Sequence, residues 1–302
     1  MTAAPAVFVS AATEDSIAVV DRYPGADERV AASGMVFGGG GPAATAAVAA
    51  ARLGVPAAVV AAVGDDEAGQ RVRERLAGEG VDVSGIVTVP GAETSRSIVV
   101  ISGPERSRAI VNRVGPALDL SVSARALELM STAPWVHVDQ HGWAAVRDVR
   151  GSIVGGVRLS IDAGNDIPGL TLHDTVLYAP TREALERRYG VGEIEPQMRR
   201  ALDEGAETVV VTDGGRGSYG LRVGEEVVHV SPPPTDVVST LGAGDVFHGA
   251  LIAGLSHVAS GRLDDFASAL AYATVTATLS CRGLDGRSRI PGHDETLRAM
   301  AR

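Results

Sequence analysis

The chain has 302 residues and a net charge of −10, and it is 45% hydrophobic but only 4% aromatic. This length suits one large α/β domain or two small ones. The acidic balance argues against a nucleic-acid partner, which normally requires a basic patch. All 27 basic residues are Arg, so a Walker A loop and a Schiff-base lysine are excluded, because each needs Lys.

The N-terminal residues show no basic region followed by an apolar stretch, so no signal peptide is predicted. The Ala/Val run over 43–63 is interrupted by Arg52, Gly54 and Pro56, which leaves it too short to span a membrane. We therefore predict a cytoplasmic protein that binds no membrane. Cys281 is the single cysteine, which excludes an internal disulfide and a Cys-rich zinc site. We interpret it as a small buried apolar residue.

The first part of the chain alternates short apolar runs with glycine-rich turns. A strand is predicted at 7–9, and alternating apolar positions over 17–36 indicate strands of a small accessory sheet. Glycines at 38–41 let the chain pass close to a ligand. The Ala-rich run that follows predicts a helix over 45–53. A buried strand and an amphipathic helix come next, over 57–63 and 67–79.

A hairpin is predicted from strands 96–101 and 109–114, and a regular alternation of helices and Val-rich strands begins after Leu118. The predicted helices are 123–130, 142–151, 181–189 and 195–204, and the strands are 135–138, 158–162, 175–178 and 208–212. This alternation predicts a mostly parallel sheet covered by helices on both faces. Ligands bind such sheets at the carboxyl ends of the strands. The loops expected at that edge are 139–141, 162–165, 212–215 and 242–245.

The most informative segment is Ser239–Asp245, a glycine turn that leads into an apolar helix. The backbone N–H groups of Gly242, Ala243 and Gly244 can approach an anion closely, and the helix N-terminus adds positive partial charge. Asp245 would place a proton acceptor beside a phosphate held there. Transfer of a phosphoryl group to a hydroxyl requires both features. The alternative is an ordinary glycine turn capped by Asp, but the second glycine cluster at 38–41 favours the phosphate interpretation.

With both glycine segments in the expected order, the chain resembles the ribokinase-like (PfkB) carbohydrate kinases along nearly its whole length. The resemblance implies one ribokinase-like α/β domain over 1–302, with lid strands from about 15–37 and 95–114. It implies that Asp245 is the catalytic base and that Gly242, Ala243 and Gly244 form the anion hole. It also implies that Asp15, Gly39 and Gly40 contact the sugar, that ATP and Mg²⁺ are bound, and that the lid strands form a homodimer.

The sequence departs from the family at three places. Ala44-Thr45 stands where the family usually has an Asn that contacts sugar hydroxyls, and Ser239 replaces an Asp that helps to bind a monovalent cation. Potassium activation is therefore doubtful. The segment linked to magnesium has decayed and leaves Glu183 as the remaining metal candidate. Similar losses occur in the ketohexokinase-like and sulfofructose-kinase-like branches, and the segments 40–45, 240–248 and 281–287 look closest to the latter.

Further candidates each have a structural alternative. The loop with Thr212, Gly214, Gly215 and Gly217 resembles the family's nucleotide loop, but it is also typical of a turn between strands. His141 could contact sugar or phosphate, or could be structural, as we expect for His248. Arg113 could hold an anionic substrate group bidentately or be a solvated surface residue. By resemblance, Arg282 and Arg287 would lie near the nucleotide and offset its charge.

These features together predict an ATP-dependent sugar kinase with Asp245 as base, despite the low pKa expected for a carboxylate at a helix N-terminus. The predicted substrate is ketohexose-like, or a sugar bearing a sulfonate or phosphate. One alternative is a nucleoside kinase, but no aromatic residue lies between Arg96 and Arg113 to stack on a base. Another is a sugar-binding regulator with impaired catalysis, which the departures motivate. Retention of Asp245 argues against it.

Overall fold

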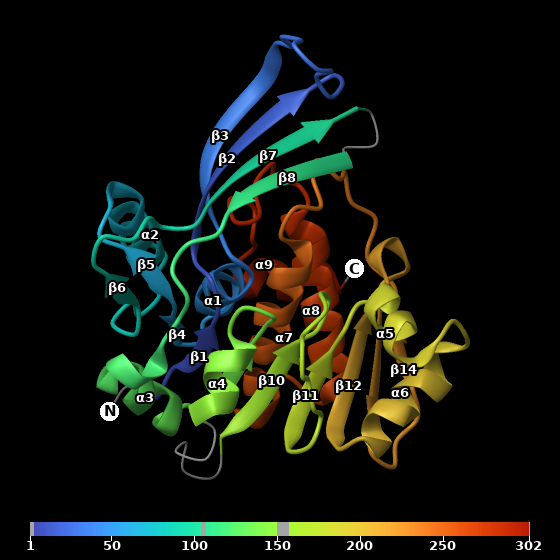
Figure 1. Ribbon diagram of the computed structural model, residues 1–302. Helices are drawn as coiled ribbons and strands as arrows, with labels where there is room; N and C mark the ends of the chain where they lie inside the picture. Colours follow the sequence, from blue (N-terminus) through green and yellow to red (C-terminus); the bar gives the residue numbers. More distant parts are fainter. Residues whose placement is uncertain (1–2, 104–106, 150–156, 302) are drawn as a thin grey trace.

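The computed structural model describes residues 3–103, 107–149 and 157–301, which build a central eight-stranded sheet in the order β14-β13-β12-β11-β10-β9-β1-β4 (Figure 1). The pairs from β4 to β12 are parallel, and β13 and β14 add an antiparallel edge. Short Val- and Ala-rich runs form the parallel strands, because such strands are buried on both faces. The strands are β1 Ala6–Val9, β4 Ala57–Val60, β9 Trp135–Val138, β10 Arg158–Asp162, β11 Thr175–Ala179, β12 Ala206–Thr212, β13 Ser218–Arg222 and β14 Val228–Val230.

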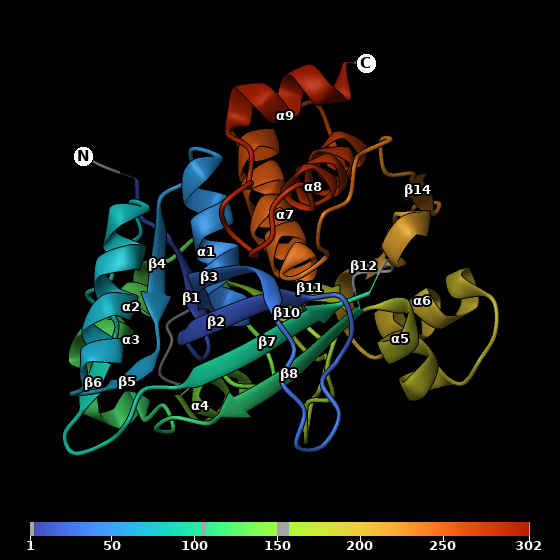
Figure 2. The same ribbon diagram turned by 90° about the horizontal axis from the view of Figure 1, so that it is seen from above.

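Helices cover both faces of this sheet, so the predicted α/β architecture is confirmed (Figures 1 and 2). One face packs against α1 Pro42–Arg52, α7 Ala243–Ala259, α8 Phe266–Ser280 and α9 His293–Met300. The other packs against α3 Ala124–Thr132, α4 Trp143–Val149, α5 Arg182–Tyr189 and α6 Ile194–Asp203. A further helix, α2 Glu67–Gly78, begins at Asp66, whose carboxylate accepts a hydrogen bond from the Gly69 N–H, a typical N-cap.

A separate four-stranded sheet stands over the carboxyl ends of the central strands and forms the lid (Figure 1). Its strands, in the order β3-β2-β7-β8, are β2 Thr13–Val20, β3 Ala32–Gly40, β7 Arg96–Ser102 and β8 Ser107–Arg113. Its inner face has a small core of Ile17, Val99 and Ile101, against which Leu241 packs. Leu241 precedes α7, so this contact joins the lid to the glycine turn.

Two predicted elements need correction. The strand expected over 57–63 is two strands, because β4 pairs with β1 whereas β5 Ala62–Gly64 pairs with β6 Val87–Val89 in a separate sheet. The helix expected from Thr45 begins at Pro42 instead, since proline suits the first turn of a helix, where its missing N–H is not needed. The hairpin turn at 104–106 and the end of the helix predicted over 142–151 fall outside the described residues.

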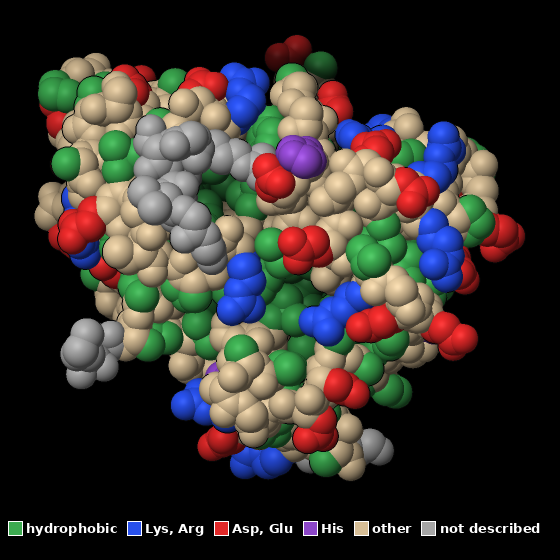
Figure 3. Space-filling model, turned by 90° about the horizontal axis from the view of Figure 1, so that it is seen from below, with side chains coloured by type: hydrophobic (Ala, Val, Ile, Leu, Met, Phe, Trp, Pro, Cys, Tyr) green, Lys and Arg blue, Asp and Glu red, His purple; other side chains and the backbone are tan. Residues whose placement is uncertain are grey.

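The opposite end of the sheet carries Arg and acidic side chains interspersed around a hollow with apolar walls, not gathered into a basic patch (Figure 3). The side chains lining this hollow include Trp135, Leu255 and Arg158. Among the described residues, no helix is both long and apolar enough to cross a bilayer.

Candidate active site

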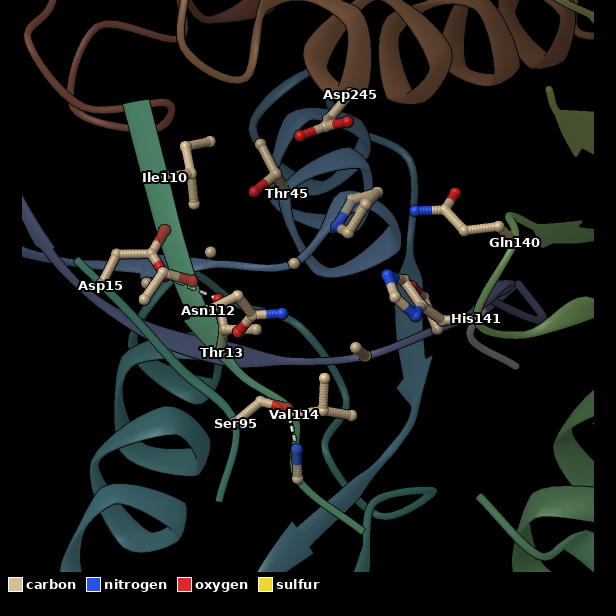
Figure 4. A pocket seen from close by; sticks show the side chains of 18 of the residues that line it. Thr13, Asp15, Thr45, Ser95, Ile110, Asn112, Val114, Gln140, His141 and Asp245 are labelled. Atoms are coloured by element: carbon tan, nitrogen blue, oxygen red, sulfur yellow. Dashed lines mark hydrogen bonds between the residues drawn. The ribbon is translucent and has the colours of Figure 1, made fainter. Parts of the chain in front are cut away.

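A cavity of about 510 Å³ lies between the lid and the carboxyl ends of the central strands. The side chains around it come from β2, β8, α1, the loop after β9 and the start of α7, so five distant parts of the sequence meet there. Figure 4 shows Asp15 and Asp245 on two sides of this space, with Thr45 between them. The polar side chains that line the cavity include Thr13, Asp15, Thr45, Ser95, Ser97, Asn112, Gln140, His141 and Asp245.

The glycine turn before α7 is shaped to receive an anion. Gly242 caps the helix with a φ of 73°, in the left-handed region that favours glycine, and a Cβ there would lie 2.8 Å from the Gly286 Cα. The Ala243 N–H donates to the Thr240 carbonyl at 3.2 Å. The N–H groups of Gly244 and Asp245 make no such bond to the described backbone, as is usual in the first turn of a helix. The Gly242 N–H likewise has no acceptor among the described residues, so these three groups are available donors of the turn.

Asp245 lies in the first turn of α7 and reaches the cavity. Burial and, after it, the neighbouring Asp162 carboxylate raise the pKa of its carboxyl, whereas His248 acts in the opposite direction, and the net result is a pKa of about 7. This corrects the expectation of a low pKa, because desolvation of the carboxyl outweighs the favourable helix N-terminus. A carboxyl group that titrates near neutrality is well matched to proton transfer.

Behind Asp245 is a buried network that involves two histidines. The Nε2 atom of His248 lies 3.2 Å from the Asp162 Oδ1 atom, and Asp162 also accepts a hydrogen bond from the Gly164 N–H. The His137 ring is 5.5 Å from the His248 ring, and its Nδ1 atom is 2.9 Å from the Ser160 hydroxyl. His248 was expected to be merely structural, but the ion pair places it among charged groups of the site.

The side of the cavity that carries Asp15 is built from β2 and the end of β3. The Asp15 carboxylate accepts a hydrogen bond from the Thr13 hydroxyl at 2.8 Å and lies against Gly40, where a Cβ would collide with it. Burial raises the pKa of the Asp15 carboxyl. Gly39, Gly40 and Thr45 all line the cavity.

Arg287 lies beneath this glycine cluster, although the sequence suggested a place beside the nucleotide. Its guanidinium is buried and donates to the Gly40 carbonyl at 2.7 Å and to the Thr45 hydroxyl at 3.1 Å. Burial lowers its pKa to about 10, which still leaves it charged at neutral pH. It therefore fixes the end of β3 against the start of α1, and no pattern in the sequence indicated this contact.

The expected anion-binding role of Arg113 has no support in this geometry. Arg113 is not among the residues around the cavity, and its guanidinium contacts the Glu93 carboxylate and the Thr94 carbonyl. Its neighbour Asn112 points into the cavity instead (Figure 4). The reason is the two-residue period of β8, which puts adjacent side chains on opposite faces of the lid.

The same period identifies a residue that sequence reasoning missed. Arg108 shares the inner face of β8 with Ile110 and Asn112, and its guanidinium donates to the Thr240 hydroxyl at 3.0 Å. Thr240 begins the turn that leads to Gly242, so the lid delivers a cation to the edge of the anion-binding turn. Counting alternate positions back from Asn112 would have found it.

His141 lines the cavity, and the Asp139 carboxylate holds its backbone by accepting the His141 N–H at 2.8 Å. The residues predicted for the nucleotide lie elsewhere on the same edge. Thr212 ends β12, and Gly214, Gly215 and Gly217 form the tight turn after it. In the sheet β12 is three strands from β9, about 14 Å at the usual spacing. Arg282 is exposed and already paired with Glu295 at 2.6 Å.

Glu183 is the candidate for magnesium. It is exposed in the first turn of α5, and it is close enough to the turn after β12 to interact with Arg216. Mg²⁺ is usually held by one or two carboxylates together with waters and substrate phosphates. A single exposed carboxylate fits this donor set.

Comparison with known proteins supports the resemblance to carbohydrate kinases that the sequence indicated. Residues 5–145 and 175–291 match the model of the pfkB family of carbohydrate kinases. Aminoimidazole riboside kinase from Salmonella typhimurium is 25% identical over 229 residues, 69% of this chain and 71% of the relative. Fructokinase from Klebsiella pneumoniae is 25% identical over 275 residues, 84% of this chain and 89% of the relative. The structure of Arabidopsis thaliana ribokinase with ribose and ATP superposes with a TM-score of 0.83 at 24% identity and covers 99% of both chains. The chain therefore belongs to the pfkB family of carbohydrate kinases, whose members are ATP-dependent phosphotransferases.

Proposed function

We propose that this kinase transfers the γ-phosphate of ATP to a hydroxyl of a small sugar, with Asp245 as the base. The observation that supports this most is that Asp245 and Gly242, from the turn that begins α7, line the same cavity as Asp15. A carboxylate, an anion-binding turn and a polar sugar-binding wall are the parts that the reaction needs.

The sugar hydroxyl would donate a hydrogen bond to Asp245 while the γ-phosphate lies against the N–H groups of Gly244 and Asp245. The transition state of phosphoryl transfer is loose, so the alcohol proton moves late, and Asp245 then accepts it. Arg108 and the helix N-terminus offset the charge on the transferring phosphoryl group. Mg²⁺, held by phosphate oxygens and Glu183, would neutralise the remaining phosphate charge.

The cavity favours a sugar over a nucleoside. Of the described residues around it, His141 is the one aromatic ring, so there is no Phe, Tyr or Trp to stack on a base. A sulfonated or phosphorylated sugar is less favoured, because Arg113 is turned away from the cavity and Arg287 is already hydrogen-bonded behind the glycine cluster. We infer a neutral ketose or a related sugar, in keeping with the fructokinase among the relatives.

The test is ADP release across D-fructose, D-ribose, a phosphosugar, a sulfonated sugar and a nucleoside, with Asp245→Asn as the inactive control. Turnover of a neutral sugar well above the control is the expected result. Preference for the nucleoside would contradict the sugar assignment. Sugar binding without any turnover would instead support a regulator.

We further infer a homodimer that forms through the outer face of the lid. Phe37, Ser16, Ile98 and Val111 are directly opposite one another across the four strands, and the three apolar side chains are 57–68% exposed. A contiguous exposed apolar surface of this kind is typical of a protein interface. A second copy is the natural partner, because the same face would pair with itself around a two-fold axis.

Sedimentation at micromolar concentration is expected to show a dimer, and Val111→Glu to show a monomer because it would bury a charge in the contact. A monomeric wild-type protein would contradict the interface. We also propose that residues 1–302 act as one kinase domain with its lid, and that the enzyme works in the cytoplasm, where ATP is supplied.

A further inference from the structure

The histidine one turn after Asp245 is held among charged groups. Asp245 and His248 are three residues apart on α7, so they lie on the same side of the helix in successive turns. His248 is 5% exposed, and its one charged partner within ion-pair distance among the described residues is Asp162, at 3.2 Å. Asp162 ends β10 and Asp139 follows β9, so two more carboxylates converge on the base from neighbouring strands.

We propose that His248 is a positioning residue for Asp245: as an imidazolium paired with Asp162, it balances the carboxylates around the base and keeps Asp245 available to the substrate hydroxyl. The inference rests on the proposed role of Asp245. It adds a dependence on a residue that does not line the cavity, because His248 is absent from the cavity wall.

The charges around the base support this arrangement. The groups that face Asp245 and His248 are Asp162, Asp139, His137 and Arg287. Desolvation opposes charge on His248, but the Asp162 and Asp245 carboxylates outweigh it and raise its pKa. His137 is neutral, because burial lowers its pKa to about 3. Without the imidazolium, the Asp162 and Asp245 carboxylates would repel each other without a balancing charge, which favours uptake of a proton by Asp245.

A bound metal ion is the alternative for these residues. Ligand atoms of His137, Asp162 and His248 lie within 4.8 Å of one another. The contacts already present argue for hydrogen bonding instead: His137 Nδ1 has Ser160 as partner, and His248 Nε2 is in direct contact with the Asp162 carboxylate. An ion pair accounts for both contacts without an ion.

The test is the pH dependence of kcat/KM for the best sugar from the panel, measured for wild type, His248→Asn and His248→Asn/Asp162→Asn. Loss of the imidazolium alone is expected to move the acid limb up by about one pH unit, since a nearby opposite charge typically shifts a pKa by one unit or more. Activity should then fall about tenfold at pH 6 and recover toward wild type at pH 9. The double variant removes both charges, so its acid limb should return toward the wild-type position.

His257→Asn is the matched control, because His257 is also buried in α7 but its Nε2–H donates to the Leu53 carbonyl, and His257 does not line the cavity. This substitution should leave the acid limb of the kcat/KM profile at its wild-type position. A uniform loss of activity in His248→Asn with an unshifted limb would overturn the proposal, as would a stoichiometric metal in dialysed wild-type protein. If His248→Asn does not fold, the pH dependence of kcat/KM is measured for Asp162→Asn/His248→Gln instead. This variant removes both charges, so an acid limb far from the wild-type position would contradict the proposed charge balance. An active Asp245→Asn would instead refute the proposed function.

Discussion

The floor and the roof of the cavity are built differently. The floor consists of the α7 turn, the ends of the central strands and Asp139, which is fully buried and accepts three hydrogen bonds, one of them from the Ser10 hydroxyl. The roof is a thin sheet whose outer face exposes Phe37 and Val111. Buried residues that are held by several hydrogen bonds keep fixed positions, whereas a sheet that packs against few neighbours can move. We infer that chemistry depends on the floor and that closure and substrate choice depend on the roof.

The largest expected effect comes from the floor. Asp245→Asn removes the base but keeps the turn and its N–H groups, so kcat should fall by about 10²–10⁴-fold while ATP binding is retained. Turnover measured by ADP release, with ATP affinity from calorimetry, separates the two. A near-normal kcat would show that the floor does not supply the base.

The pH dependence of the wild type tests the same carboxyl group without a substitution. Asp245 acts when ionised, and its pKa is raised to about 7, so kcat/KM should be constant at higher pH and fall about tenfold per unit below neutrality. An acid limb near pH 4 would mean that the carboxyl is not desolvated as the structure indicates. If the lid closes over bound sugar and excludes water, as we infer, the acid limb for kcat should lie no lower than that for kcat/KM.

The sequence predicted the floor better than the roof. The helices and strands of the central sheet follow from periodicity and glycine positions. The Gly242–Asp245 segment is contiguous, so its local shape could be predicted from the sequence. Three other features of the site could not be predicted from the sequence. The raised pKa of Asp245 depends on burial by distant segments. The position of Arg287 depends on how its loop folds against the end of β3. Strand register decides that Asn112, and not Arg113, points into the cavity.

A smaller effect is expected at the roof. Arg108→Ala removes a cation that contacts Thr240 at 3.0 Å, and a charge-assisted hydrogen bond is worth about 1.5–3 kcal/mol, so kcat/KM for ATP should fall roughly tenfold or more. Arg113→Ala is the matched control from the same strand, because its side chain faces away from the cavity. Equal losses in both variants would show that the lid contributes through its stability and not through the inner-face charge.

The smallest expected effect is the stimulation of activity by potassium, which concerns Ser239 in the floor of the cavity. Ser239 is buried, its hydroxyl accepts the Leu241 N–H at 3.1 Å, and its own N–H donates to the Cys281 carbonyl. A neutral side chain already used in this way offers a monovalent cation no negative charge. We therefore expect stimulation of less than about twofold, because the attraction of a carboxylate for the cation is missing. Initial rates in potassium, sodium and large organic cation buffers at equal ionic strength measure it, and Ser239→Asp should increase the response. A many-fold stimulation of the wild type would mean that main-chain carbonyls around the Cys281 turn bind the cation by themselves. The floor would then depend on an ion as well as on its protein contacts.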